Sequence, residues 1–536
     1  MNLFPPSKQP YVNQTITIDT IQTAVLEGDH VIVCSPTGSG KTLALLCGAL
    51  GSPQKQATDP SEPDAKHARP LSKVFYASRT HTQLDQALQT LRTLNGWHGK
   101  TALLSSRDQS CVHPSAKQKT GAERNDACRD LVAHSACEFF DGTMEIEGVC
   151  DIEDLVRLGQ AHQACPYYSS KNHAKTADIV FLPYNYILDP TIRKNMELDL
   201  RDAIVIIDEA HNIESVARDA ASLELSKVSI HKIMGQLDDL GFTDLKHMLY
   251  MLYTFNSPTV RPSVEQWPLR EKLPRWRFQA DELKKVRDAK MAVIGMVEQI
   301  IAVFRFVLDY PADYRFVTQS INNQDTVCVM CMNPAVAMSS FIQEIRTLVI
   351  ASGTLTPLNG LAEELGIEFK HQLELPHVVP KDNVRVSIIP RYANQTMDST
   401  YQNASNPAYL KAAGECVMML SESVPGGILV FVSSYKTLEL LQAAWRPLPW
   451  RKRVFYELRG PAFDRELEHY RAAAPTGAVL VAVTRGRVSE GIDFADAQAR
   501  CVCMLGIPFP SSQDVKVAEK KAYQDKEHRS LKGGEW

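Results

Sequence analysis

One short stretch of this sequence carries the residue types that bind a nucleoside triphosphate. Residues 35–42 read Ser-Pro-Thr-Gly-Ser-Gly-Lys-Thr. Gly38 and Gly40 allow the backbone to curl, so that successive N–H groups can face a chain of phosphates. Lys41 can then reach the β- and γ-phosphates, and the Thr42 hydroxyl can ligate Mg²⁺. The other residues of this predicted nucleotide-binding loop are Ser35, Pro36, Thr37 and Ser39.

A second stretch supplies the carboxylates that hydrolysis of such a nucleotide needs. Residues 208–211 read Asp-Glu-Ala-His. Asp208 would hold Mg²⁺, Glu209 would polarise the attacking water, and His211 would sense the γ-phosphate. An Asp-Glu pair after a strand is common by chance, but here it follows a phosphate-binding loop in the same chain. The two stretches together predict an ATPase.

The surrounding residues predict the elements that position both stretches. A β-branched run at 31–33 precedes the loop and an apolar, helix-forming run at 43–50 follows it, in the order of a P-loop. The five apolar residues 203–207 predict a buried parallel strand that ends at Asp208. Gln14, just before a helix predicted at 16–26, is a candidate reader of the adenine edge or a solvated helix-cap residue. The expected class is therefore α/β.

Length and composition set wider limits on the protein. The 536 residues predict three or four structural units. With 58 basic and 62 acidic residues the net charge is −4, so composition alone does not indicate nucleic-acid binding. The N-terminus has no apolar signal segment and no run is long enough to span a membrane, which predicts a soluble, intracellular protein. In such a protein the twelve cysteines are expected to be reduced or to bind metal.

Six motifs in order carry a family resemblance. Residues 35–42, 78–83 and 208–211 resemble motifs I, Ia and II of superfamily 2 DEAH helicases, and residues 352–357, 427–435 and 485–494 resemble motifs III, IV and V. Together they resemble the iron-sulfur DNA helicases of the xeroderma pigmentosum group D family. Residues 43–47, 151–155, 183–186 and 506–510 look closest to its FANCJ and telomere-elongation-regulator branch.

This resemblance implies two RecA-like P-loop lobes with parallel sheets, the first carrying two insertions. The expected parts are lobe 1 at 1–105, an iron-sulfur domain at 106–168, lobe 1 again at 169–213, a helical arch at 214–325, the end of lobe 1 at 326–366, and lobe 2 at 367–536. Lobe 2 is expected to begin with a strand at 384–389. By the same resemblance, Gly491 and Asp493 would serve the nucleotide.

Five cysteines lie between motifs Ia and II. Cys111, Cys128, Cys137 and Cys165 are separated by 17, 9 and 28 positions, which is not the short knuckle spacing of a zinc ribbon. Spacing alone leaves zinc, an iron-sulfur cluster and separate thiols open. The resemblance implies that these four hold a [4Fe-4S] cluster and that Cys150 does not take part.

The resemblance also implies contacts with DNA. The expected nucleic-acid contacts are Arg79, Thr80, Tyr184, Asn185 and Arg485. Between 261 and 290, nine basic residues alternate with Trp267, Trp276 and Phe278, which suits either a single strand of nucleic acid or a solvated helix face. Cys328 and Cys331, despite their metal-like spacing, are expected in the core.

The implied function is an ATP- and Mg²⁺-dependent DNA helicase. It would be a monomeric motor moving 5′ to 3′ on single-stranded or forked DNA in the nucleus, with repair proteins as partners and no membrane. Motif VI, which supplies arginines to the γ-phosphate, is missing before Trp536, so the chain is expected to be truncated. The alternatives are a non-catalytic fragment that binds ATP and nucleic acid, and a DEAH RNA helicase.

Overall fold

The computed structural model describes residues 3–51, 72–238, 243–254, 294–321, 323–400, 402–460, 462–492, 494–510, 514–526 and 532–534. These residues form two compact units. Unit 1 comprises Met1–Val378 and Ala518–Trp536, and unit 2 comprises Val379–Val517. Asp493 and the basic and aromatic residues between 261 and 290 lie outside the described residues. None of the described helices is long and apolar enough to cross a membrane.

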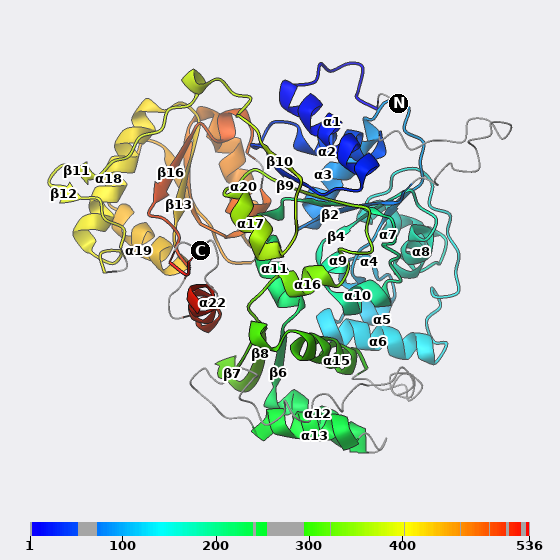
Figure 1. Ribbon diagram of the computed structural model, residues 1–536. Helices are drawn as coiled ribbons and strands as arrows, with labels where there is room; N and C mark the ends of the chain where they lie inside the picture. The colour runs from blue at the N-terminus through cyan, green and yellow to red at the C-terminus, as the bar shows by residue number, and fades with distance from the viewer. Residues whose placement is uncertain are drawn as a thin grey trace. The chain divides into compact units, whose positions relative to one another are not determined.

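Unit 1 is built on a seven-stranded parallel sheet (Figure 1). The strand order is β10-β1-β9-β5-β2-β4-β3. The strands are β1 (Val31–Cys34), β2 (Val74–Ser78), β3 (Thr101–Leu103), β4 (Ile179–Pro183), β5 (Ile204–Asp208), β9 (Thr347–Ser352) and β10 (His371–Glu374). Nearly every residue of the five central strands is buried, because helices cover both faces. The predicted strands before the P-loop and before Asp208 are thereby confirmed.

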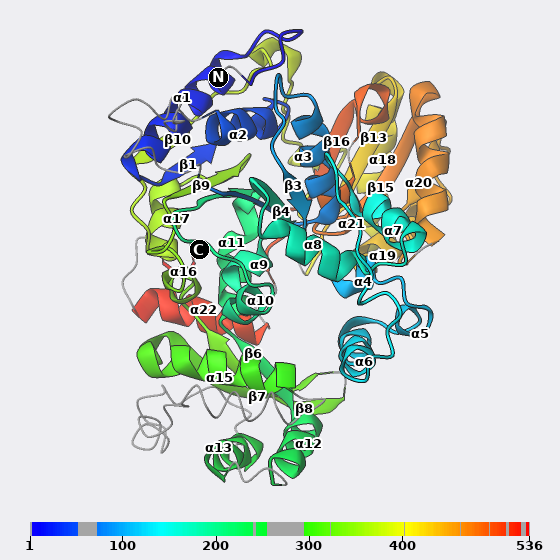
Figure 2. The ribbon, with the colours of Figure 1, turned by 90° about the vertical axis from the view of Figure 1, so that its right-hand side faces the viewer.

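Each face of this sheet has its own apolar core. One face is covered by α1 (Val12–Glu27), α2 (Lys41–Leu50) and α3 (His81–Arg92). The other is covered by α9 (Asn185–Leu188), α10 (Pro190–Asn195), α11 (Ile213–Ala220), α16 (Ala335–Ser339) and α17 (Leu358–Leu365), among others. Figure 2 shows α1 and α2 on one side of β1 and β9, with α11, α16 and α17 on the other.

The segment between β3 and β4 folds as short helices. These are α4 (Arg107–Ser110), α5 (Pro114–Lys117), α6 (Gly121–Ala133), α7 (Ile152–Ala161) and α8 (Pro166–Ala174) (Figure 2). Loops without regular structure join α6 to α7 and α7 to α8. Such a segment gains little from backbone pairing, so its shape depends on side-chain contacts and on anything its cysteines bind.

The second insertion contains a small sheet, of which the sequence predicted only the Val/Met-rich strand around 328–331. β6 (Leu223–Ser226), β8 (Gln324–Cys331) and β7 (Tyr314–Ile321) form an antiparallel sheet in that order. It accompanies α12 (Lys227–Asp238), α13 (Thr243–Thr254) and α15 (Ile294–Asp309). The described residues between 214 and 325 are mostly helical, as expected, but β6 and β7 were not predicted. Cys328 and Cys331 lie in β8 and are buried, as expected for core residues.

Unit 2 holds a four-stranded parallel sheet of order β14-β15-β13-β16. The strands are β13 (Gly427–Val432), β14 (Arg453–Tyr456), β15 (Ala478–Val483) and β16 (Cys501–Leu505), and a short hairpin pairs β11 (Arg391–Tyr392) with β12 (Gln395–Thr396). The helices are α18 (Pro407–Ser423), α19 (Tyr435–Trp445), α20 (Ala462–Ala473) and α21 (Arg487–Gly491). The strand expected at 384–389 was wrong, since these residues are exposed and pair with no strand among the described residues.

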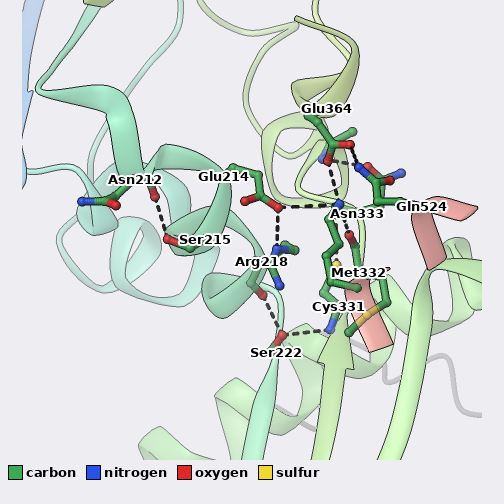
Figure 3. A network of polar contacts seen from close by, with 12 residues as sticks. Asn212, Glu214, Ser215, Arg218, Ser222, Cys331, Met332, Asn333, Glu364 and Gln524 are labelled. Carbon is green, nitrogen blue, oxygen red and sulfur yellow. Dashed lines mark hydrogen bonds and ion pairs between the residues drawn. The ribbon is translucent and has the colours of Figure 1, made fainter. Parts of the chain in front are cut away.

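The last helix, α22 (Val515–Lys526), returns to unit 1 from Ala518 onward. Its Lys520 is fully buried and donates to the Met332 carbonyl oxygen at 2.9 Å and to Glu364 Oε2 at 2.6 Å. Figure 3 shows the polar network around this point, which also includes Glu214 of α11 and Gln524 of α22. The network joins α22 to the helices that follow β5 and β9.

Candidate active site

The order of strands in unit 1 creates the candidate site. The chain leaves β1 through α2 and enters β2, but β9 and β5 lie between those two strands in the sheet. In parallel sheets, ligands bind beyond the carboxyl ends of the strands where neighbouring connections diverge. Three loops meet at this edge: the P-loop after β1, the Asp-Glu-Ala-His stretch after β5, and the motif III loop after β9. Because β9 lies in the middle, Ser352 at its end stands between the other two loops.

The P-loop has the predicted curled backbone. Gly38 and Gly40 have φ angles of 78° and 71°, a region that favours glycine. Within the loop, the Ser35 and Ser39 hydroxyls lie 2.8 Å apart, and the N–H of Ser35 donates to the Ser352 carbonyl oxygen at 3.0 Å. This backbone hydrogen bond connects the loop to the end of β9 as well as to β1.

Lys41 joins the P-loop to the second motif. Its Nζ lies 3.0 Å from Oε1 of Glu209, and only 7% of its side chain is exposed. Burial alone would raise the pKa of Glu209, but the hydrogen bond from His211 and the charge of Lys41 outweigh it and lower this pKa to about 2. Glu209 also has a φ of 54°, a strained backbone of the kind found at functional sites.

Asp208 is held by three donors. Its Oδ1 accepts from the N–H of Glu209 at 2.9 Å. Its Oδ2 accepts from the Tyr76 hydroxyl at 2.5 Å and from the Thr42 hydroxyl at 3.4 Å. Burial raises the pKa of Asp208, whereas Lys41 and Tyr76 act in the opposite direction. The hydroxyl of Thr42 and the carboxylate of Asp208 together offer the oxygen ligands that Mg²⁺ prefers.

His211 and Ser352 complete the arrangement. Nδ1 of His211 lies 3.2 Å from the Ser352 hydroxyl and 3.4 Å from Oε2 of Glu209. The Ser352 hydroxyl also donates to Oε2 of Glu209 at 3.3 Å. A movement of the loop after β9 would therefore shift both His211 and Glu209, because both contact the Ser352 hydroxyl.

Gln14 lies against the P-loop. Its amide N–H donates to the Gly40 carbonyl oxygen at 3.1 Å, and its Oε1 accepts from the N–H of Tyr11 at 2.9 Å. These contacts connect the start of α1 to the loop, and adenine recognition by Gln14 stays a prediction.

The four predicted cluster cysteines line one pocket in the helical insertion. Cys111 follows α4, Cys128 lies in α6, Cys137 follows α6, and Cys165 precedes α8. Val112, Ala116, Leu131, Phe139 and Tyr168 are among the other lining residues. Cys150 does not line it and instead donates to the Glu147 carbonyl oxygen at 3.5 Å.

The chemistry of these side chains bears on what the pocket can hold. Four cysteine thiols meet in one pocket lined otherwise mainly by apolar residues. Thiolates are the ligands of both tetrahedral zinc sites and iron-sulfur clusters. The residues therefore fit a thiolate-bound metal group, and the [4Fe-4S] cluster stays a prediction.

Two of the predicted nucleic-acid segments meet in unit 1. The N–H of Tyr184 donates to the Ser78 carbonyl oxygen at 3.1 Å, which brings the loop after β4 beside the loop after β2. Thr80 caps α3, because its hydroxyl accepts from the N–H of Gln83. Arg79 on the loop after β2 and Asn185 at the start of α9 are half-buried.

The remaining predicted residues belong to unit 2. Arg485 is exposed, with a φ of 60°, just before α21, and Gly491 ends that helix. Contacts of Arg79, Thr80, Tyr184, Asn185 and Arg485 with nucleic acid stay predictions.

Sequence reasoning missed two residues of the site in unit 1. Tyr76 was predicted only as a member of an apolar strand, and Ser352 only as the first residue of motif III. Both reach the site because of which strands are neighbours, and neither spacing nor residue type shows that. The polar tip of Tyr76 in an otherwise apolar run was the one available signal.

Comparison with known proteins agrees with this geometry. The chain matches models of the DEAD/DEAH box helicase at residues 13–120, DEAD_2 at 76–230 and the helicase C-terminal domain at 417–536. It is 31% identical to a regulator of telomere elongation helicase 1 homolog of Drosophila mojavensis, covering 98% of this chain and 66% of the relative. For the Drosophila ananassae homolog the identity is 30%, over 98% of this chain and 67% of the relative.

The chain belongs to the family of superfamily 2 helicases that includes these regulator of telomere elongation helicase 1 homologs. The resemblance drawn from the six motifs is thereby confirmed. A solved XPD helicase matches the fold of this helicase with a TM-score of 0.59 at 20% identity, over 96% of this chain and 88% of that one. The expected two-lobe α/β fold is confirmed as well. The helicase spans about two thirds of the length of the curated relatives it matches.

Proposed function

We propose that this chain is an ATP-hydrolysing motor of a DNA helicase that acts in genome maintenance. The observation that carries the proposal is the contact of Lys41 and Ser352 with one carboxylate, Glu209, at 3.0 and 3.3 Å. Three loops that are distant in sequence thus meet at the edge of the sheet where P-loop proteins bind nucleotide.

The residues have distinct roles in the proposed hydrolysis. The P-loop N–H groups and Lys41 bind the phosphates, while Thr42 and Asp208 hold Mg²⁺. Entry of a γ-phosphate gives Lys41 a new partner and frees the carboxylate of Glu209 to orient the attacking water. Electrostatic stabilisation of charge on the γ-phosphate lowers the barrier. His211 and Ser352 relay the state of the nucleotide to neighbouring loops.

We propose single-stranded and forked DNA as the substrate track. Arg79, on the loop after β2, and Asn185, at the start of α9, would contact the DNA backbone, and Arg485 would provide a further exposed cation in unit 2. The proposed motor moves from 5′ to 3′ as a monomer and works in the nucleus with repair proteins as partners. The names of the relatives support a role at telomeres.

We propose that Cys111, Cys128, Cys137 and Cys165 hold a [4Fe-4S] cluster. The cluster would supply a structural cross-link of four chain segments. Burial raises the pKa of the Cys165 thiol to about 11, so this thiol stays protonated unless a cation binds it. Cys128 and Cys165 are buried in this pocket, whereas Cys111 and Cys137 are partly exposed.

The proposed function is tested by ATP hydrolysis with Mg²⁺, with and without single-stranded DNA or RNA. We expect DNA to stimulate turnover and Lys41→Ala to abolish it. Lys171→Ala is the matched control, because Lys171 also forms a short ion pair, 2.8 Å from Glu197, but outside the site. Nucleotide binding without turnover would indicate a non-catalytic fragment. Stimulation by RNA alone would indicate an RNA helicase.

A further inference from the structure

The carboxylate of Asp208 has a hydrogen-bond donor that lies outside all six motifs of this chain. The Tyr76 hydroxyl donates to Oδ2 of Asp208 at 2.5 Å. Both residues are buried, with exposed fractions of 1% for Tyr76 and 6% for Asp208. A hydrogen bond to an ionised acceptor in such surroundings is among the stronger ones in proteins.

The register of the sheet explains why this phenol reaches Asp208. Tyr76 in β2 is paired in parallel with Ile206 in β5. Side chains alternate between faces along a strand, so Asp208, two residues after Ile206, lies on the same face as Tyr76. The long side chain of Tyr76 spans the distance from its own pairing position to the end of the neighbouring strand.

The ring of Tyr76 cannot easily turn away. Its other strand partner is Phe181 in β4, whose ring centroid lies 5.2 Å from that of Tyr76. Tyr76, Phe181 and Ile206 belong to the same apolar core. The hydroxyl is therefore a fixed donor. The carboxylate of Asp208 accepts one hydrogen bond from Tyr76 and another from the backbone N–H of the next residue, Glu209.

We propose that Tyr76 is a positioning residue for the metal-bound nucleotide: its hydroxyl fixes the carboxylate of Asp208 in the orientation that binds Mg²⁺ together with Thr42. The inference rests on the proposed ATPase function. The Tyr76 hydroxyl bonds to Oδ2, the oxygen that also lies 3.4 Å from the Thr42 hydroxyl, and Oδ1 bonds to the N–H of Glu209. The carboxylate therefore cannot rotate freely, and Oδ2 stays beside Thr42. Partners that orient metal ligands in this way are typically worth 10- to 100-fold in metal affinity or activity.

The test is Tyr76→Phe, which removes the hydroxyl and keeps the ring. Nucleotide binding and hydrolysis are measured against Mg²⁺ concentration, and nucleotide binding is also measured in EDTA. We expect the Mg²⁺ concentration at half-saturation to rise about tenfold. Affinity for the nucleotide in EDTA and the rate at saturating Mg²⁺ should stay within about twofold of the wild type, because the loop itself is intact.

Tyr314→Phe is the matched control. Tyr314 is also fully buried in unit 1, and its hydroxyl donates to the Ala221 carbonyl oxygen at 2.9 Å, away from the site. It should lower stability to a similar degree without changing the Mg²⁺ dependence. An unchanged half-saturation in Tyr76→Phe would overturn the inference and leave Tyr76 a structural residue.

A double-mutant cycle provides a second criterion. In an Asp208→Asn background, adding Tyr76→Phe should have no further effect on Mg²⁺ dependence of nucleotide binding, because the two residues act as one unit. Additive effects would contradict the proposal. If the wild type binds nucleotide but does not hydrolyse it, the proposed function fails, whereas the Mg²⁺ dependence of binding still decides the role of Tyr76.

Discussion

The ammonium group of Lys520 lies 2.6 Å from Oε2 of Glu364, and both side chains are almost entirely buried. Lys520 also lies 3.6 Å from Glu214, which follows the Asp-Glu-Ala-His stretch, while Glu364 belongs to the helix that follows motif III. A buried charge without a partner is costly, so Lys520 and Glu364 depend on each other where α22 packs on unit 1.

Replacing Lys520 with methionine should therefore destabilise unit 1 strongly. We expect a loss of about 3–5 kcal/mol in the free energy of unfolding, because Glu364 would keep a buried charge without its partner. Adding Glu364→Gln should recover part of the loss. Lys526→Met, at an exposed position of the same helix, is the control. Denaturant unfolding measures all three, and equal midpoints for Lys520→Met and Lys526→Met would contradict the prediction.

Glu209 should make the stability of the protein depend on acid pH. Its pKa in the folded state, about 2, lies below the ordinary 4.5, so its ionised form contributes stability above pH 4.5. That contribution is lost as the pH falls through 2. The difference in unfolding free energy between wild type and Glu209→Gln should accordingly shrink between pH 5 and pH 2. In a Lys41→Met background the difference should be smaller throughout, and a pH-independent difference would contradict this account.

The cluster cysteines and Cys150 should differ in iron content. Replacing Cys111, Cys128, Cys137 or Cys165 with serine should remove most of the iron, acid-labile sulfide and visible absorbance, because each lines the pocket. Cys150→Ser is the matched control and should keep them, since Cys150 lies outside the pocket. A colourless wild-type protein that contains one zinc ion would refute the cluster.

Much of the motor could be predicted from sequence because its signals are local. The residues of the P-loop and of Asp208–His211 follow strands that are apolar throughout, and burial on both faces requires such runs. The side-chain neighbours of Asp208 could not be predicted in the same way. Tyr76 reaches it through the pairing of β2 with β5, and this register is a long-range property of the sheet.

The second insertion shows why some elements were missed. β7 and β8 form an antiparallel pair that is joined to β6 from a distant part of the chain. The apolar residues of β8 follow no strict alternation, since its last six positions are all buried. The Val/Met-rich run at 328–331 still indicates a strand, but nothing local shows that β6 and β7 are its partners, because this pairing is long-range. At 384–389 the apolar residues alternate as in a strand, but they are exposed and pair with no strand among the described residues.

Ser352 should couple nucleotide hydrolysis to the neighbouring loops through its hydroxyl. Ser352→Ala removes the contacts with His211 and Glu209 but keeps the backbone contact between Ser35 and Ser352. A hydrogen bond to a charged group is worth about 1.5–3 kcal/mol. We therefore expect DNA-stimulated kcat to fall about 10- to 100-fold, with KM for ATP nearly unchanged.

The control for this prediction is another buried serine. Ser421 in unit 2 is 1% exposed, like Ser352, and its hydroxyl donates to the Met418 carbonyl oxygen at 2.6 Å. Ser421→Ala should leave both kinetic constants close to wild type. If Ser352→Ala instead raises KM and preserves kcat, the hydroxyl shapes the nucleotide site without relaying its state. In that case the coupling must run through the backbone contact between the P-loop and β9.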